Sequence, residues 1–441
     1  MLVLSVIPAL SRFANAEETP WMHIPENSFD QGWGLLDLDR LWDTGRWQED
    51  RSLTGSWGGT REQLYQYGIA VLGSYESEFA TNPVGGELHK ARYCDTLGVA
   101  LFLDLERLFN FKDTFLLASA AQRFGHSLSA DIPNFFTTQQ LYGGETIRLV
   151  HLAVEKGFLQ NRLDVVAGRL NALDDFATSS YFCYSQNIGI CGNPFSLQTN
   201  SSLSNYPLAS WGFRGRYDVT SDLYSMTGVY NTYEHFGDNK YHGVDFSIRH
   251  NSGVAVIEEF AYRPKKRREA GYPGFLKIGG FYDSEPRPAF ADDGLRTNKM
   301  ISTNWTIYAI AQQKLYHPAG AGLRQGLTGF LSLTYSPPAS NTLQYFANAG
   351  LVYIGWVPHR ENDAIGAFGL LGEFSNDLRA SQREANVDAV QTQEAVFELN
   401  YRYEATPFSY VQPDIQYVVR PNGTGTISNA LVLAIQVGVT L

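Results

Sequence analysis

Few side chains in this sequence stand in a pattern that could catalyse a reaction. The clearest candidate is the adjacent carboxylate pair Asp174-Asp175, which could exchange protons with a substrate or bind calcium. Paired carboxylates in loops more commonly cap backbone amides or pair with arginines. The sequence contains no Gly-x-Ser-x-Gly, His-Glu-x-x-His or phosphate-binding loop. We therefore expect a protein that is not an enzyme and that holds no cofactor or metal.

The three cysteines are too few for a disulfide framework. Cys183 and Cys191 lie close together in a stretch rich in Asn, Gly and Ser, and in an oxidising compartment they could form a disulfide that closes this loop. Cys94 is then left as a free thiol. No pair of histidines stands near them at the spacing of zinc ligands, so we expect no zinc site.

Length and charge limit the possible functions. The chain has 441 residues and a formal net charge of -11, and this acidic balance argues against nucleic acid as a partner. No run of apolar residues is long enough for a transmembrane helix. The basic run 265–268 is predicted to be a solvated turn that could touch anionic lipid headgroups.

The N-terminus has the pattern of a secretory signal. Residues 2–10 are mostly apolar, and Ala14-Asn15-Ala16 is a small-x-small cleavage site, although the basic start of a signal peptide is missing. A frayed apolar terminus is the alternative. We predict a truncated signal peptide at 1–16 and a periplasmic N-terminal segment with short helices at 17–68, one of them capped by Thr60. Residues 17–50 of this segment are rich in tryptophan.

The last stretch of the chain, residues 430–441, is predicted to be a β-strand with two unlike faces. Its odd positions are apolar and branched, and its even positions are mostly small or polar. Roughly sixteen segments of this kind follow residue 68, and bacterial membrane barrels have an even number of strands. The segments are 69–80, 91–105, 114–124, 144–156, 162–170, 209–219, 222–232, 253–263, 274–284, 303–316, 326–337, 343–357, 364–375, 391–404, 409–420 and 430–441.

A soluble sandwich could also use amphipathic strands, but the number and length of these segments favour a barrel that spans a membrane. Long connections at 125–143, 171–208, 233–252 and 285–302 alternate with short turns, which is the pattern of external loops and periplasmic turns. The predicted fold is therefore an all-β, transmembrane, 16-stranded antiparallel β-barrel at 69–441, located in the bacterial outer membrane. Its closing strand 430–441 should pair with 409–420 and 69–80.

Several short motifs, in this order, resemble the carbohydrate-selective porins of the OprB family. The resemblance spans residues 50–441. The motifs are Leu53-Thr54-Gly55-Ser56-Trp57-Gly58-Gly59-Thr60-Arg61, Asn82-Pro83-Val84-Gly85-Gly86, Arg123-Phe124-Gly125-His126-Ser127-Leu128-Ser129-Ala130-Asp131, Ala167-Gly168-Arg169-Leu170-Asn171-Ala172, Asp174-Asp175-Phe176, Cys191-Gly192-Asn193-Pro194 and Gln412-Pro413-Asp414-Ile415-Gln416-Tyr417.

This resemblance implies a barrel whose external loops fold inward and form an eyelet of arginines, an acidic residue and an aromatic. Arg123 and Arg148 match eyelet arginines, whereas Gln139 or Gln140 stands where the family has its acid. A second family arginine is replaced around Gly143. The 171–208 loop contains no tryptophan, and the sequence printed here ends in Leu rather than Phe.

A sugar is neutral, ringed with hydroxyls and flat on its CH faces, so a pore that favours it needs planar hydrogen-bonding groups and an aromatic face. We expect these groups at Arg123, Arg148, Gln139, Gln140 and Tyr142, which bracket one inward-folding loop. Arg92 is a second-rank candidate, because it shares a strand face with Gly98 and Asp104. The alternative for each arginine is a solvated lumen charge that has no role in selectivity.

The function that follows is passive, carbohydrate-selective diffusion of small sugars across the outer membrane. The expected partners are small sugars and outer-membrane lipid, and the chain could be a monomer or a homo-oligomer. An alternative is a barrel that supports exopolysaccharide export or envelope structure, in which residues 17–50 dock a partner.

Overall fold

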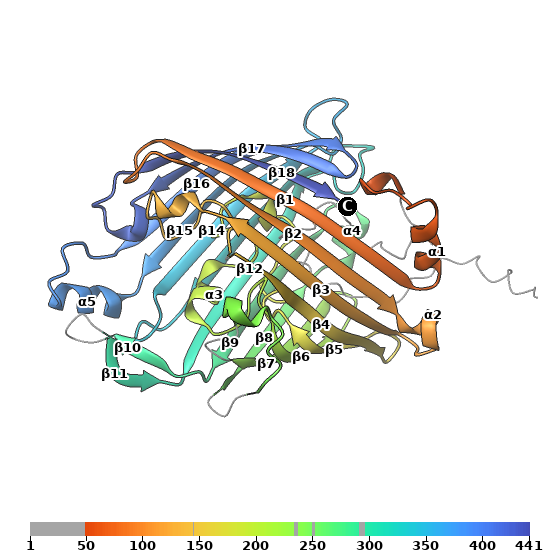
Figure 1. Ribbon diagram of the computed structural model, residues 1–441, viewed down its shortest axis with the longest axis horizontal. Helices are drawn as coiled ribbons and strands as arrows, with labels where there is room; N and C mark the ends of the chain where they lie inside the picture. The colour runs from red at the N-terminus through yellow and green to blue at the C-terminus, as the bar shows by residue number, and fades with distance from the viewer. Residues whose placement is uncertain (1–48, 144, 233–236, 249–251, 291–295) are drawn as a thin grey trace, which may run out of the picture.

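The computed structural model describes residues 49–143, 145–232, 237–248, 252–290 and 296–441. The predicted signal peptide at 1–16 and most of the tryptophan-rich segment lie outside these residues. The described chain forms one closed antiparallel barrel of 16 strands (Figure 1), which confirms the predicted fold. None of its helices is long and apolar enough to cross a membrane.

The barrel strands overlap all of the predicted segments. Each strand pairs with its neighbour in sequence, and the last strand pairs with both β17 and β1, as expected for the closing strand. The strands are β1 Ile69–Val84, β2 Ala91–Asp104, β3 Thr114–Gly125, β4 Thr146–Phe158, β5 Leu163–Leu170, β6 Ser210–Asp218, β7 Leu223–Thr232, β8 Gly253–Tyr262, β9 Gly274–Asp283, β12 Asn304–Tyr316, β13 Gly326–Tyr335, β14 Leu343–Ile354, β15 Ala364–Phe374, β16 Gln393–Thr406, β17 Ser409–Val419 and β18 Ala430–Thr440.

One predicted loop contains further strands. The segment 285–302 holds β10 (Arg287–Phe290) and β11 (Arg296–Ile301), which pair with each other in a separate two-stranded sheet. These strands were missed because they are short and do not alternate apolar and polar residues. Their hydrogen bonds are made within the hairpin, so the barrel order passes directly from β9 to β12.

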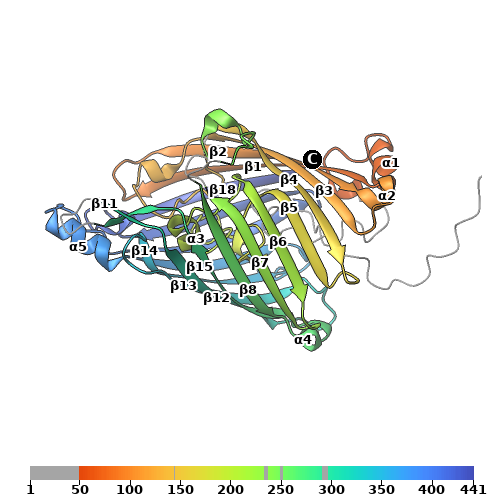
Figure 2. The same ribbon diagram turned by 90° about the horizontal axis from the view of Figure 1, so that it is seen from below.

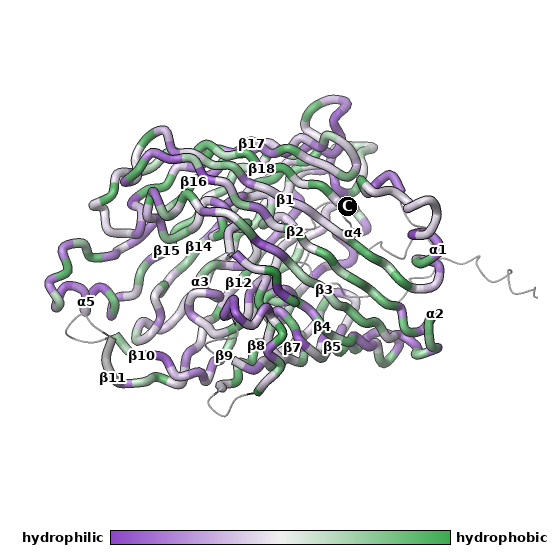
Figure 3. The backbone as a smooth tube through the Cα atoms, viewed as in Figure 1, coloured by the Kyte–Doolittle hydropathy of each residue, from purple (hydrophilic) through white to green (hydrophobic). Residues whose placement is uncertain are grey.

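The two faces of each strand have different surroundings because successive side chains point to opposite sides of the sheet. In β18 the odd residues Leu433 and Ile435 are exposed, whereas the even residues Val432 and Gln436 are buried. Hydrophobic and hydrophilic residues alternate in the same way along many strands (Figure 3). The outward face is therefore apolar and the inward face is small or polar, which is the arrangement of a barrel in lipid.

The two ends of the barrel differ in their connections (Figures 1 and 2). One end carries α1 (Thr60–Gln66), α2 (Leu105–Phe109) and α4 (Lys265–Glu269), together with the shorter turns. The other end carries the long loops, the β10–β11 hairpin and α5 (Asn376–Glu384). By the usual asymmetry of outer-membrane barrels, the first end is periplasmic and the second is external.

Residues before β1 fasten the periplasmic end of the β1–β18 seam. The Arg61 side chain donates to the backbone oxygens of Leu441 at 2.9 Å and Val71 at 2.7 Å. Thr60 was predicted to cap α1, but the N-cap is Gly59 and Thr60 is the first helical residue. The reason is the left-handed conformation of residue 59, with φ of 92°, which glycine adopts without steric cost.

Two external loops fold into the barrel, as predicted. They are the connection 126–145, which contains η3 (Leu128–Ala130), and the connection 171–209, which contains η4 (Phe182–Tyr184) and α3 (Phe195–Asn200). Their aromatic residues pack against inward-facing aromatics of the strands and fill part of the interior. This cluster includes Phe136, Phe176, Phe182, Phe330, Phe346 and Phe374.

Candidate pore constriction

The loop 126–145 is tied to two parts of the barrel wall, three strands apart, by carboxylates that accept hydrogen bonds from its backbone. On β1, Glu78 Oε2 accepts from the backbone N–H of Leu141 at 3.2 Å. On β16, the Glu394 carboxylate accepts from the backbone N–H groups of Phe135 and Phe136, each at 2.8 Å. Charge-assisted bonds of this kind are among the strongest in proteins. The loop therefore lies between β1 and β16 inside the barrel.

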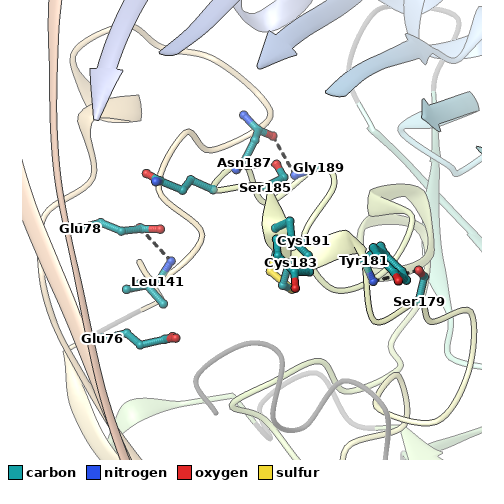
Figure 4. Close-up of a disulfide and its surroundings, with 12 residues drawn as sticks. Glu76, Glu78, Leu141, Ser179, Tyr181, Cys183, Ser185, Asn187, Gly189 and Cys191 are labelled. Atoms are coloured by element: carbon teal, nitrogen blue, oxygen red, sulfur yellow. Dashed lines mark hydrogen bonds between the residues drawn. A yellow bond between two sulfur atoms is a disulfide. The ribbon is translucent and has the colours of Figure 1, made fainter. Parts of the chain in front are cut away.

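A second inward segment comes from the loop 171–209 and is closed by a disulfide between Cys183 and Cys191 (Figure 4). It lies against β16 through Glu398, whose carboxylate accepts from the Ser185 hydroxyl at 2.5 Å and from the backbone N–H of Gln186 at 2.8 Å. The Asn400 amide donates to the backbone oxygen of Tyr184 at 2.7 Å. The disulfide-closed segment, residues 183–191, is thus held against the wall by its backbone.

The adjacent carboxylates of the same loop have structural partners. Asp174 Oδ2 lies 2.8 Å from His151 Nε2 on β4, and Asp175 Oδ2 lies 3.2 Å from Arg214 Nε on β6. Both carboxylates are buried. They fix the start of the loop to the wall, which agrees with the pairing role favoured over acid–base chemistry.

Strand register places two rows of lumen-facing residues side by side, the first on six neighbouring strands and the second on four of these. The first row runs through β3, β2, β1, β18, β17 and β16, and the second lies one step towards the external end. We call these residues, together with Arg402 of β16, the lumen belt. Its rows are Arg123, Thr96, Glu76, Gly438, Tyr410 and Glu404, and then Cys94, Glu78, Gln436 and Gln412.

Glu76 lies between two arginines of the belt. It accepts a hydrogen bond from the Tyr410 hydroxyl at 2.6 Å, and it interacts electrostatically with both Arg402 and Arg123. The Tyr410 ring can reach it because Gly438 stands between them in the row, where a Cβ atom would lie 2.2 Å from the ring. Figure 4 shows Glu76 and Glu78 together on β1, facing the interior where the disulfide-closed segment lies.

The other arginine of the belt is stacked between aromatic rings. The Arg402 guanidinium lies 4.0 Å from the centre of the Tyr410 ring and 4.8 Å from that of Tyr184. Its Nε donates to Gln412 Oε1 at 2.7 Å, which fixes the plane of the guanidinium. The Arg402 guanidinium, with its two aromatic neighbours, thus lies on one side of Glu76, and Arg123 lies on the other.

Several buried atoms of the belt have no hydrogen-bond partner within the protein, although buried polar groups are normally paired. They include donors of Arg123 and acceptors of Glu76, Glu78 and Gln436. The belt therefore combines free donors with free acceptors at one level of the barrel. Donors and acceptors together complement a group that both donates and accepts, as a hydroxyl does, although these atoms are covered by the protein in this structure.

The predicted residue Arg123 contacts the predicted loop through its backbone. Arg123 Nη1 lies 3.5 Å from the backbone oxygen of Tyr142, and its guanidinium lies 5.2 Å from the centre of the Tyr206 ring. The Tyr142 side chain itself is exposed. A Cβ atom at Gly143 would lie 2.3 Å from Arg123 Nη1, so any larger residue there would require Arg123 to move.

The two predicted glutamines are buried, and Gln139 uses its amide within the protein. Gln139 Oε1 accepts from the backbone N–H of Leu128 at 2.8 Å, and its Nε2 donates to the backbone oxygen of Glu78 at 3.2 Å. Gln140 instead keeps an unpaired Oε1. Gln139 thus anchors the loop to β1, whereas one acceptor of Gln140 is not used within the protein.

The remaining predicted arginines lie outside the two rows of the belt. Arg148 Nη2 donates to the backbone oxygen of Gly237 and to Asn239 Oδ1, both at 2.9 Å. Arg92 forms a bidentate pair with Asp131 at 2.6 and 2.9 Å. Arg148 interacts electrostatically with Arg123, so its charge can influence the belt. The charge of Arg92 is instead neutralised by the carboxylate of Asp131.

Sequence reasoning missed the other half of the belt. Glu76, Glu78, Arg402 and Tyr410 all stand at even positions of amphipathic segments, so their alternation with apolar residues identifies them as lumen-facing. The expected acid was sought at Gln139 or Gln140, and carboxylates near Arg123 are instead supplied by β1. Nothing in the sequence pattern alone sets the heights of β1, β3 and β16 relative to one another.

A closed barrel with an apolar outer face, inward-folded loops and a polar belt defines a channel protein of the bacterial outer membrane. The model of the carbohydrate-selective porin, OprB family, matches residues 88–441, and the chain belongs to this family. This is a family of porins, which are channels rather than enzymes.

Individual relatives cover most of the chain. Porin B of Pseudomonas aeruginosa is 28% identical over 418 residues, which are 87% of this chain and 90% of that protein. A putative porin QuiX of Acinetobacter baylyi is 28% identical over 414 residues, covering 88% and 92%. The high-pH structure of Pseudomonas putida OprB superposes with a TM-score of 0.83 at 26% identity, covering 89% of this chain and 99% of that one.

Proposed function

We propose that the protein lets small sugars diffuse passively across the outer membrane, with the lumen belt as its selective constriction. The observation that carries this proposal is the placement of Glu76 between Arg123 and the Arg402–Tyr410 stack, with unpaired donors and acceptors around it. A sugar hydroxyl can accept from an arginine and donate to a carboxylate at the same time. The Tyr410 and Tyr184 rings add apolar faces suited to the CH side of a sugar.

Passive diffusion requires a site that binds weakly and releases readily. The belt meets this need because its residues stand on the barrel wall and the loops beside it are fixed by hydrogen bonds to Glu394 and Glu398. A solute would exchange hydrogen bonds with a preformed lining, and no large rearrangement would accompany passage. Among the residues predicted from the sequence, we propose that Arg123, Gln140 and Tyr142 contribute to the constriction directly. Arg148 would contribute at longer range through its charge.

Liposome swelling with glucose, a disaccharide, an amino acid and a salt tests this function. We expect glucose to enter faster than an amino acid of similar size. Arg123→Ala and Arg402→Ala should each lower the ratio of glucose to amino-acid flux by up to about tenfold, because each removes a charge-assisted hydrogen bond. Lys240→Ala, a change at an exposed lysine of the external loop 237–248, is the matched control and should leave the ratio unchanged.

Equal rates for all four solutes would contradict carbohydrate selectivity and leave a general porin. A folded barrel that admits no sugar would instead favour the alternative of exopolysaccharide export or envelope structure. Deleting residues 17–50 further distinguishes sugar diffusion from a role in export or envelope structure. Sugar flux should be nearly unchanged if the segment is not part of the channel, whereas a docking role would be lost.

A further inference from the structure

A strongly basic surface lies at the periplasmic end of the barrel, away from the lumen belt. Helix α4, in the connection between β8 and β9, consists of Lys265, Lys266, Arg267, Arg268 and Glu269, and all of these residues are exposed. Figure 2 shows α4 projecting from the rim at the end that carries α1 and α2. We call the four cationic side chains of this helix the α4 basic patch.

The patch reaches onto the outer surface of the barrel rather than into its lumen. Arg267 Nη1 donates to Gln313 Oε1 at 2.7 Å. Gln313 stands on the outward face of β12, two residues before the exposed Leu315, whereas its neighbours Gln312 and Lys314 face inward. Arg267 is therefore directed along the surface that contacts the membrane.

The apolar band of the barrel ends beside this patch. The exposed outward residues nearest to α4 in the chain are Tyr262 at the end of β8 and Tyr272 and Leu276 around the start of β9. Tyrosines are favoured where hydrocarbon meets the headgroup layer, because one end of the side chain is apolar and the other is wet. The α4 basic patch thus stands at the level of the headgroups of the periplasmic leaflet.

The charges of the patch are largely unmatched by the protein. Lys265 Nζ lies 3.9 Å from Glu269 Oε1, and both side chains are more than half exposed. Within the described part of the chain, Lys266, Arg267 and Arg268 have no carboxylate at ion-pair distance. A net positive surface at a headgroup layer attracts anions, and Arg in particular binds phosphate through its planar fork.

We propose that the α4 basic patch is a binding site for the phosphate headgroups of anionic phospholipids in the periplasmic leaflet. The membrane is favoured over a soluble partner because Arg267 is held against the lipid-facing wall and aromatic residues flank the patch. Each Lys or Arg near an anionic membrane surface adds to the electrostatic attraction. The site would enrich anionic lipid around one sector of the barrel and fix its depth there.

Native mass spectrometry of the full chain from nanodiscs that contain phosphatidylethanolamine and phosphatidylglycerol tests this site. The variant Lys265→Gln, Lys266→Gln, Arg268→Gln should retain phosphatidylglycerol about tenfold less than the wild type, and Arg267 is kept to preserve its contact. The matched control Lys90→Gln, Lys240→Gln, Arg383→Gln removes the same charge from exposed side chains of the external loops. It should retain the lipid like the wild type.

Added salt should weaken wild-type retention of phosphatidylglycerol, because the attraction is electrostatic. Equal retention by the α4 variant and the wild type would overturn the proposal. Equal loss in the two charge variants would also overturn it, since net charge rather than the patch would then be responsible. Selective loss of a co-purifying protein with unchanged lipid would indicate a protein partner instead. Unchanged migration of the folded barrel in unheated gels shows that the variants fold.

Discussion

Two buried carboxylates that face the interior from different sectors of the barrel wall, Glu259 and Glu76, use their hydrogen bonding differently. In the sector from β8 to β14, Glu259 accepts from the backbone N–H of Ala177 at 2.9 Å and from the hydroxyls of Tyr224 at 2.7 Å and Tyr308 at 2.9 Å. Its other neighbour is Lys277 Nζ at 3.8 Å. The hydrogen bonds of this carboxylate are therefore made within the protein.

In the sector from β16 through β18 to β3, the carboxylate of Glu76 makes one hydrogen bond to Tyr410 and keeps its other oxygen unpaired. Glu78 likewise keeps one unpaired oxygen. Both sectors look alike in sequence, because each places acidic residues on the inward face of a strand. The difference teaches that a polar lumen residue can serve a solute only when the loops leave part of its hydrogen bonding unused.

The largest expected effect is a loss of stability when Glu259, the carboxylate whose hydrogen bonds are all made within the protein, is replaced. Glu259→Ala should lower the free energy of unfolding by about 3–5 kcal/mol, because it removes a buried carboxylate that pairs with Lys277 and accepts from two tyrosine hydroxyls. Glu76→Gln, which keeps a hydrogen-bond acceptor for Tyr410, should change stability by less than about 1 kcal/mol and should alter sugar flux. Urea unfolding in lipid vesicles and liposome swelling measure the two quantities.

These two variants test the comparison directly. If Glu76→Gln destabilised the barrel as much as Glu259→Ala, the lumen belt would be another structural network. If Glu259→Ala changed sugar selectivity while the fold stayed intact, the solute path would lie along the opposite sector.

The disulfide-closed segment offers the next largest effect, because it forms part of the boundary between the two sectors. Replacing both Cys183 and Cys191 by Ser should cost about 2–3 kcal/mol of stability, since the short loop gains freedom in the unfolded chain. It should also widen the distribution of single-channel conductances, because the Tyr184 ring and the Gln186 backbone dock against Arg402 and Glu398. A reductant should have the same effect on the wild-type channel.

Cys94→Ser is the matched control for this experiment. Cys94 is a buried free thiol next to Glu78, so its replacement keeps the disulfide and should leave the response to reductant unchanged. A wild-type conductance that is insensitive to full reduction would show that backbone hydrogen bonds alone hold the segment.

The strands and the closure of the barrel were predictable because an alternation of two residues is a local property of the chain. The same alternation is consistent with inward faces for Glu76 and Arg402, but it cannot place them near Arg123. Their proximity depends on the pairing of β1 with β18 and on the register of each pair between β3 and β16. Of these, the β1–β18 pairing joins residues from opposite ends of the sequence.

Loop residues were less predictable than strand residues for a related reason. Gln139 has the chemistry of a sugar ligand, yet the backbone oxygen of Glu78 and the backbone N–H of Leu128 occupy its amide. Whether a polar side chain is free or used depends on where an irregular loop meets the wall, and no sequence period describes that path. The β10–β11 hairpin escaped prediction because its strands are short.

The smallest expected effect concerns Asp363, a carboxylate in the periplasmic turn before β15 whose hydrogen bonds are also made within the protein. Burial alone would raise its pKa, but hydrogen bonds from Arg360, Tyr401 and the backbone of Glu404 outweigh burial, and the pKa of Asp363 lies below its usual value. Because the folded-state pKa is the lower one, this group stabilises the barrel at neutral pH. That contribution is lost as the pH falls below about 4, the usual pKa of Asp.

Asp363→Asn should therefore lower stability at pH 7 by less than about 1 kcal/mol, since Arg360 is partly exposed and solvent screens the pair. The difference from the wild type should shrink as the pH falls into the acidic range, and sugar flux should stay the same at every pH. Urea midpoints measured at neutral and acidic pH give the first quantity, and liposome swelling gives the second. A change in sugar selectivity would contradict the comparison between used and unused carboxylates. Asp363 lies outside the lumen belt and its hydrogen bonds are already used, so it should not influence the solute.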